Sequence, residues 1–248
     1  MQFFFIFFLL TISSLTAQEQ CCHSFFASFI YPNSLVFDVG AHIGKKTVHY
    51  RACGARVICI EPQPDCCQEL HKKFDSDPYI IIEPCGLASF TGMLSLAICS
   101  DATTISTFSD QWQEEGRFFE HGYVWETHIM VPVTTLDILI ARYGVPFFCK
   151  IDVENFEYEV LKGLTQPIPF ISFEFAIETV ENAVLCVAYL KNLGYNTFNF
   201  AIGEIMAFAL ETWISADDII PLIIQLSQEY DWSEEWGLWG DIYARHPS

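Results

Sequence analysis

The clearest chemical pattern in the sequence is a glycine turn in the stretch VFDVGAHIGKKT, Val36 to Thr47. Asp38 lies near the end of an apolar run, Gly40 permits close approach of the backbone to a ligand, and Gly44 permits a tight start of a helix. Seventeen residues further on, Glu61 ends the next apolar run. An acidic side chain there can accept hydrogen bonds from both hydroxyls of a ribose. The pattern predicts a site for the adenosine part of a cofactor, although an ordinary strand–turn–helix corner can carry the same glycines.

The spacing of the glycines distinguishes between cofactors. A dinucleotide site holds its pyrophosphate with G-x-G-x-x-G, and His42 stands where the second glycine of that pattern would be. The sequence reads D-x-G-x-x-x-G instead. Asp38 places a negative charge beside the turn, which suits a sulfonium and an α-amino group. The expected cofactor is therefore S-adenosyl-L-methionine, and an NAD-dependent enzyme is the alternative that the spacing disfavours.

Three further carboxylates follow apolar runs near the middle of the chain. Asp152 and Glu154 belong to the segment KIDVE, and Glu174 ends the next run. Ligands of open α/β sheets bind at the carboxyl ends of the strands. Methyl transfer requires alignment of an acceptor oxygen and removal of its proton. We therefore predict that Asp152, Glu154 and Glu174 are the catalytic candidates.

Each of these assignments has a structural alternative. Glu154 and Glu157 are also placed to stabilise a helix N-terminus. Lys150 is expected to pair with an acid instead of contacting a substrate. His121 and His128 are expected to be exposed loop residues and not catalytic bases.

Short apolar runs alternate with helical stretches after residue 33. This alternation is typical of βαβ units and predicts an α/β fold with a mostly parallel sheet and helices on both faces. Strands are expected at Leu35–Val39, Arg56–Glu61, Tyr79–Glu83, Pro146–Asp152, Phe170–Phe175, Tyr195–Phe200 and Leu238–Ala244.

Residues 91–133 depart from this alternation. Strands are expected at Thr91–Cys99 and Ile129–Val133, with a long polar and aromatic segment between them. Long segments of this kind often form lids or binding loops. Its aromatic residues could form a wall for a sugar or a lipid, or pack on the core. After it, Thr134 is expected to cap a helix, with Asp137 as its capping-box partner.

Composition limits the class of partner. The chain has 248 residues, 52% of them hydrophobic, which suits one domain with a sizeable core. Its formal net charge of −19 repels phosphate backbones and anionic lipids. Nucleic acid is therefore not expected as a partner.

The N-terminus adds a separate segment. Residues 1–17 are uncharged and mostly apolar, and predict a signal peptide or a hydrophobic anchor, unless the chain starts further on. Residues 18–33 form a lead-in, and residues 34–248 the catalytic domain. A functional signal or anchor would make the protein exported or membrane-associated, and its absence would make it cytoplasmic.

Ten cysteines follow residue 17, and their spacing does not fix a disulfide pairing. No Cys/His spacing indicates a zinc site, so no metal is expected.

Four segments together resemble the FkbM family of S-adenosylmethionine-dependent methyltransferases: DVGAHIGKKT, IEPQPD, VTTLD and KIDVENFEYEVLKG. The resemblance implies a class I methyltransferase fold, with a seven-stranded sheet and a reversed final hairpin. The implied activity is O-methylation of sugars or natural products.

The resemblance also implies roles for single residues. Asp38, Gly40 and Gly44 would line the methionine part of the cofactor, and Glu61 would hold its ribose. The segment 85–89, which contains Gly86, would lie beside the adenine. The family usually has Asn at the position of His42 and Gly at the position of Asn155. The side chain of His42 can still hydrogen-bond the cofactor.

The export-like N-terminus leaves a second hypothesis open. S-adenosylmethionine is made in the cytosol, so an exported domain of this type could be a catalytically inactive binding module. The sequence does not distinguish it from an active enzyme.

Overall fold

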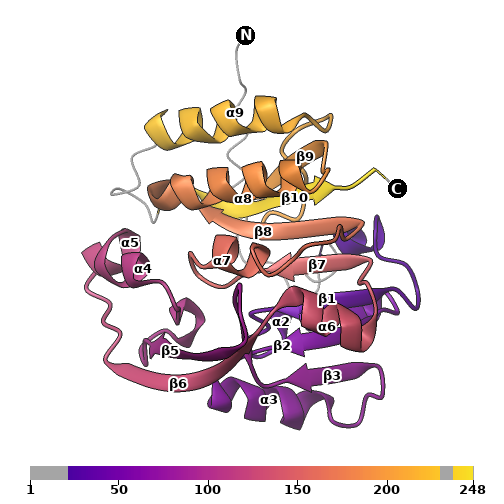
Figure 1. Ribbon diagram of the computed structural model, residues 1–248, viewed down its shortest axis with the longest axis vertical. Helices are drawn as coiled ribbons and strands as arrows, with labels where there is room; N and C mark the ends of the chain where they lie inside the picture. Colours follow the sequence, from indigo (N-terminus) through magenta and orange to yellow (C-terminus); the bar gives the residue numbers. More distant parts are fainter. Residues whose placement is uncertain (1–21, 230–236, 248) are drawn as a thin grey trace, which may run out of the picture.

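The computed structural model describes residues 22–229 and 237–247. Its centre is a seven-stranded sheet with the order β3-β2-β1-β7-β8-β10-β9 (Figure 1). The strands are β1 (Leu35–Val39), β2 (Arg56–Ile60), β3 (Ile80–Glu83), β7 (Phe148–Ile151), β8 (Phe170–Ala176), β9 (Thr197–Ile202) and β10 (Trp239–Arg245). The predicted signal or anchor, residues 1–17, lies outside the described residues.

The sheet is parallel from β3 to β8, and β10 runs antiparallel between β8 and β9. This arrangement confirms the predicted α/β class and the reversed final hairpin. The central strands are buried on both faces, which explains why they read as continuous apolar runs and not as alternating ones. The chain order reverses between β1 and β7, so their carboxyl ends open a crevice for ligands.

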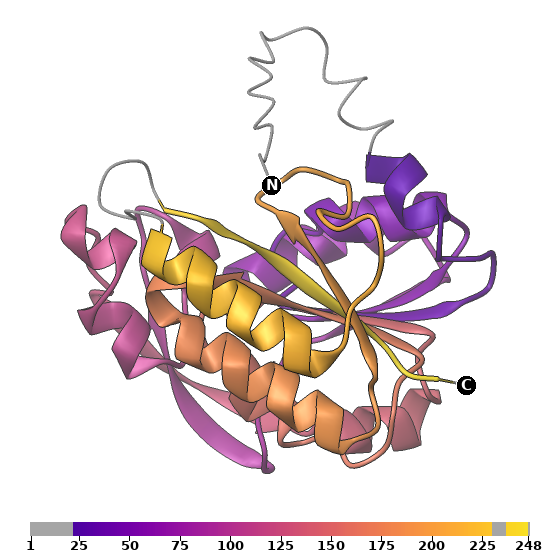
Figure 2. The same ribbon diagram turned by 90° about the horizontal axis from the view of Figure 1, so that it is seen from above.

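Helices cover both faces of the sheet (Figure 2). One face carries residues 22–27, α2 (Lys45–Ala52) and α3 (Pro64–Phe74), whose apolar side chains form one core cluster. The other face carries α6 (Leu136–Tyr143), α7 (Glu157–Leu161), α8 (Val180–Asn192) and α9 (Ala216–Glu229), over a second and larger cluster. Both layers are therefore fixed by apolar burial.

A small second sheet stands beside the main one, with the order β4-β6-β5. It consists of β4 (Gly86–Leu87), β5 (Gly92–Ile98) and β6 (Thr127–Thr134). The segment between β5 and β6, residues 99–126, is not an open loop, because it forms the short helices η1 (Thr103–Ile105), α4 (Asp110–Glu114) and α5 (Arg117–Glu120). We call residues 99–126 the insertion.

A buried ion pair fastens the insertion to the main sheet. The guanidinium of Arg117 donates two hydrogen bonds to the carboxylate of Glu178, and a third to the carbonyl of Leu238. The side chains of Arg117 and Glu178 are 3% and 2% exposed. This contact holds α5 over the end of β8.

One helix cap differs from its prediction. Thr135, and not Thr134, is the N-cap of α6, and its hydroxyl accepts from the backbone N–H of Ile138. The carboxylate of Asp137 does not close a capping box, because it binds the backbone N–H and the hydroxyl of Thr165. The helix was predicted correctly, and only its first residue shifts, since β6 extends through Thr134.

Two findings bear on the compartment. The nine cysteines within the described residues are all buried, and the eight that follow Cys22 are free. No helix in the described ranges is long and apolar enough to cross a membrane.

Candidate active site

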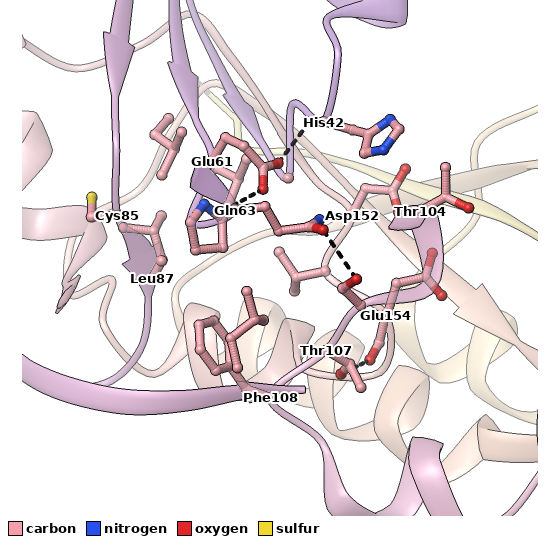
Figure 3. Close-up of a pocket in the computed structure, with 18 residues that line it drawn as sticks. His42, Glu61, Gln63, Cys85, Leu87, Thr104, Thr107, Phe108, Asp152 and Glu154 are labelled. Carbon is pink, nitrogen blue, oxygen red and sulfur yellow. Dashed lines mark hydrogen bonds between the residues drawn. The ribbon is translucent and has the colours of Figure 1, made fainter. Parts of the chain in front are cut away.

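A pocket of about 480 Å³, including the solvent at its mouth, lies at the carboxyl ends of β1 and β2 (Figure 3). Gly40, His42 and Glu61 line it from the glycine turn and from the residue after β2. Cys85 and Gly86 line it from the segment that the sequence assigned to the adenine. The structure thus brings together the residues predicted for the adenosine half of a cofactor.

Glu61 is held in place by the backbone around it. One carboxylate oxygen accepts the N–H of His42 at 2.7 Å, and the other accepts the N–H of Gln63 at 2.8 Å. The side chain is only 2% exposed, and this burial raises its pKa to about 7 against the opposing effect of the two hydrogen bonds. Each oxygen keeps a lone pair with which it can accept from a ribose hydroxyl.

The insertion covers this pocket. His42 Nε2 lies 2.9 Å from the hydroxyl oxygen of Thr103. Gln63 donates to the carbonyl of Thr103 at 3.1 Å and accepts from the hydroxyl of Ser106 at 3.1 Å. Phe108 faces Glu61 across the pocket (Figure 3), and a Cβ on Gly86 would lie 2.7 Å from its ring. Sequence reasoning expected a binding loop here, but did not single out Gln63.

The two glycines of the turn serve different purposes. Gly40 has φ +77°, and a Cβ there would lie 1.8 Å from the backbone oxygen of Asp152. The close approach at Gly40 is therefore to the chain after β7, as well as to the pocket that it lines. Gly44 lines neither of the two largest cavities, because it packs against Leu70 and Phe74. Its role is the start of α2, and the predicted contact with the methionine part has no support here.

Asp38 faces a second and larger cavity. Its carboxylate accepts from the Thr47 hydroxyl at 2.5 Å, and burial raises its pKa to about 6. The cavity is an open cleft of about 1430 Å³, including the solvent at its mouth. It shares Gly40, His42, Thr104, Asp152 and Glu154 with the first pocket, so the two cavities adjoin.

The three predicted catalytic carboxylates converge in this cleft. Asp152, Glu154 and Glu174 each offer an oxygen within 4.8 Å of the other two. Lys150, which is buried, donates to Asp152 at 3.0 Å and to Asp241 at 2.8 Å, as the pairing hypothesis expected. We call Asp152, Glu154 and Glu174 the carboxylate cluster.

The members of the carboxylate cluster have different proton affinities. Burial would raise the pKa of Asp152, but the charge of Lys150 and its hydrogen bond outweigh it and lower the value. Burial and the negative charge of Asp152 raise the pKa of Glu154 and of Glu174 well above that of an ordinary glutamate. The ionised form is therefore favoured at Asp152, and the protonated form is favoured at Glu154 and Glu174 relative to an ordinary glutamate.

The backbone after β7 directs Glu154 into the cleft. Glu154 and Asn155 have φ values of +56° and +66°, in the left-handed region that Asn tolerates. The Thr107 hydroxyl donates to the carbonyl of Glu154 at 2.6 Å and fixes this turn. Helix α7 begins only at Glu157, whose carboxylate accepts the N–H of Val153 at 3.0 Å. The helix-terminal role thus fits Glu157, while Glu154 faces both cavities.

Aromatic side chains also line the cleft, and we call them the aromatic wall. They are Trp112, Phe118 and Tyr123 of the insertion, and Trp239 at the start of β10. His121 and His128 line neither of the two largest cavities. The sequence indicated an aromatic wall in this segment, but Trp239 could not be assigned to it, because it lies more than a hundred residues further on.

The family follows from comparison with known proteins. The sequence model of the methyltransferase FkbM domain matches residues 38–197. The chain belongs to the FkbM methyltransferase family. The match includes every predicted site residue, from Asp38 to Glu174.

One curated relative is the hexuronic acid methyltransferase AglP of Haloferax volcanii. It is 28% identical over 149 residues, which are 57% of this chain and 54% of that protein. The chain thus matches about half the length of this relative.

Solved structures of other methyltransferases align along most of the chain. The precorrin-6y C5,15-methyltransferase of Geobacter metallireducens has a TM-score of 0.46 at 10% identity, covering 98% of this chain and 94% of that one. An rRNA methylase of Streptococcus thermophilus has a TM-score of 0.43 at 10% identity, covering 95% of this chain and 100% of that one.

Proposed function

We propose that this FkbM-family protein is an S-adenosyl-L-methionine-dependent O-methyltransferase acting on a hydroxyl of a sugar, glycolipid or other small molecule. The observation that carries the proposal is the junction of the two cavities. The pocket lined by Glu61 and Gly86 adjoins, at Gly40 and His42, a cleft that holds the carboxylate cluster. A methyl donor and an acceptor could therefore meet where the cavities adjoin.

The residues present fit the cofactor. Glu61 would accept hydrogen bonds from the ribose hydroxyls with its remaining lone pairs, and the pocket beside Cys85 and Gly86 would take the adenine. Asp38 would face the α-amino group, whose positive charge would favour its ionised form. When bound, the cofactor supplies an electrophilic methyl group on a sulfonium sulfur.

The carboxylate cluster would orient the acceptor hydroxyl and take its proton. Asp152 is fixed by Lys150 and stays ionised. Glu154 has the raised pKa that makes a carboxylate a stronger base once it is deprotonated. We therefore assign Glu154 as the general base. Turnover should rise with pH through a pKa above the usual 4.5 of glutamate.

The negative charge of the chain supports a small acceptor. With a net charge of −19, the protein would repel a nucleic acid backbone. The relative that acts on a hexuronic acid supports a sugar as the acceptor class.

Calorimetry with S-adenosylmethionine and with NAD tests the cofactor, followed by transfer of a labelled methyl group to a panel of glycans. We expect binding of S-adenosylmethionine alone and transfer to at least one hydroxyl. No heat with S-adenosylmethionine would exclude the proposal. Binding without transfer to any acceptor would favour the inactive binding module instead.

A further inference from the structure

The charges that line the cleft are unevenly matched. Its acidic residues are Asp38, Asp152, Glu154, Glu174 and Glu204, and its basic residues are Lys45, Lys46, Arg117 and Lys150. Three of the four cations already bind acids: Lys46 pairs with Glu204, Arg117 with Glu178, and Lys150 with Asp152 and Asp241. Lys45 is exposed. The cleft therefore offers a ligand more negative than positive charge.

Glu154 and Glu174 carry this imbalance. Within the described residues neither side chain forms an ion pair with a cation, although both lie within 4.8 Å of the Asp152 carboxylate. Ionised carboxylates in such a site are unfavourable unless a positive charge compensates them. A ligand that places a cation between Glu154 and Glu174 would supply the compensating positive charge that the described residues do not.

The aromatic wall of the cleft also suits a cation. Trp112, Phe118, Tyr123 and Trp239 line it. The faces of aromatic rings attract ammonium groups, and tryptophan does so best. The indole N–H of Trp112, whose side chain is 4% exposed, has no hydrogen-bond partner within the described residues. It is available to an oxygen of a ligand.

We propose that the acceptor carries a cationic nitrogen, such as the free amino group of an amino sugar, bound between Glu154, Glu174 and the aromatic wall. This proposal rests on the proposed function, because it names the chemical class of that enzyme's acceptor. It separates the chain from its relative that acts on a hexuronic acid, whose carboxylate the cluster would repel. A divalent metal also binds carboxylates, but it gains nothing from four aromatic neighbours.

Binding of such a cation should release protons. In the empty cleft, burial and the charge of Asp152 raise the pKa values of the two glutamates and so favour their protonated forms. An ammonium group favours the ionised forms, so it displaces these protons as it binds. The same event would leave Glu154 able to act as a base.

Four methyl glycosides of one hexose test the proposal on the full chain saturated with S-adenosylhomocysteine. They carry a free 2-amino group, an N-acetylated amino group, the parent hydroxyl, or a hexuronic carboxylate. The amino glycoside should bind at least about tenfold more tightly than the other three, the scale of one charged hydrogen bond. Its binding heat should vary with the ionisation enthalpy of the buffer, which reports the released protons.

Variants connect the preference to the residues. Glu154→Gln should remove most of the advantage of the amino glycoside, and Trp239→Leu should reduce it severalfold. Glu159→Gln is the control, since it removes a carboxylate that pairs with Lys162 and lines neither the pocket nor the cleft, and it should keep the advantage.

Three results would overturn the proposal. The first is equal binding of the four glycosides, and the second is no binding of the amino glycoside. The third is binding of Mg²⁺ or Ca²⁺ that Glu154→Gln abolishes, together with no preference for the amino glycoside. The proposed function fails by a different result, the absence of S-adenosylmethionine binding. Amino-glycoside binding measured on the protein without cofactor would then still show whether the cleft takes a cation.

Discussion

Two groups of carboxylates flank the junction of the cavities, and they are built differently. The residues proposed to hold the cofactor form the cofactor side, and those proposed to contact the acceptor form the acceptor side. On the cofactor side, Glu61 accepts two backbone N–H groups and Asp38 accepts the Thr47 hydroxyl. On the acceptor side, Glu154 and Glu174 crowd against Asp152 and have no cation of their own. The carboxylates of the first group have their hydrogen-bond donors without a ligand, whereas Glu154 and Glu174 lack a compensating positive charge among the described residues.

This difference separates holding a ligand from reacting with it. Hydrogen bonds from fixed backbone groups orient a carboxylate at no further cost when the ligand binds. Burial raises pKa values on both sides, so the difference lies in position: Glu154 and Glu174 crowd against Asp152 in the cleft where an acceptor would bind, and could exchange protons with it. The cofactor side should therefore respond to mutation in affinity, and the acceptor side in turnover.

The largest effect should come from Gly40, where the two sides meet. In Gly40→Ala the new Cβ would lie 1.8 Å from the backbone oxygen of Asp152. We expect the free energy of unfolding to fall by at least about 4 kcal/mol, measured by urea denaturation. The control is Gly122→Ala, which has a similar φ of +81° and no atom within 4 Å. It should cost about 1–2 kcal/mol, and equal losses in both variants would contradict the contact with Asp152.

The cofactor side should also make stability depend on pH. The folded chain holds the proton of Glu61 up to a pKa of about 7, whereas the unfolded chain loses it near 4.5. The folded state thus binds more protons in this window, so stability is highest below it and falls as pH rises. Glu61→Gln should remove on the order of 3 kcal/mol of that fall between pH 4.5 and 7. An identical pH dependence of the free energy of unfolding in the variant and the parent would refute the raised pKa of Glu61.

On the acceptor side, Glu154→Gln should lower turnover about a hundredfold, because a general base contributes on that scale. Its affinity for S-adenosylmethionine should stay within about twofold, as expected for a group that does not hold the cofactor. Glu159→Gln is the control, since this residue pairs with Lys162 and lines neither of the two largest cavities. A tenfold loss of cofactor affinity in Glu154→Gln would contradict the proposal that the acceptor side acts on turnover and not on cofactor affinity.

The smallest effect should be on cofactor affinity. Glu61→Gln keeps the shape of the side chain but loses one acceptor oxygen, and should weaken S-adenosylmethionine binding about tenfold. Glu83→Gln changes the residue at the end of the neighbouring strand, which accepts a hydrogen bond from Arg142 and lines neither of the two largest cavities. Calorimetry on both should show the loss in the first variant only. An unchanged affinity in Glu61→Gln would remove this residue from the cofactor site.

The sequence predicted most of the main sheet, because buried parallel strands are continuous apolar runs ended by Gly, Pro or acidic residues. It also predicted that Asp38, Glu61 and the carboxylate cluster lie along one edge of the sheet, since each lies near the end of such a run. Their roles in binding and catalysis stay predictions. Gly44 was assigned to the cofactor, but its turn faces Phe74. A glycine pattern gives the backbone conformation, and not what the turn contacts.

The folding of the insertion was harder to predict. Its helices have only three to five residues, too short for a periodic pattern to identify. Its docking depends on Arg117 and Glu178, which are 61 residues apart. Trp239 reaches the same wall through the antiparallel pairing of β10 with β8. These contacts join residues that are far apart in the sequence. They depend on the tertiary fold, so local spacing does not predict them.

The insertion is divided along its length, and this division has a consequence for how the family could diversify. Ser106, Thr107 and Phe108 line the pocket proposed for the cofactor, Thr104 lines both cavities, and Trp112, Phe118 and Tyr123 line the cleft proposed for the acceptor. Ser109, the N-cap of α4, stands between the two parts. A chimaera joined at Ser109 could take its acceptor wall from another family member and keep its own cofactor cover. Evolution could exchange the recognised molecule at this junction without rebuilding the methyl-donor site.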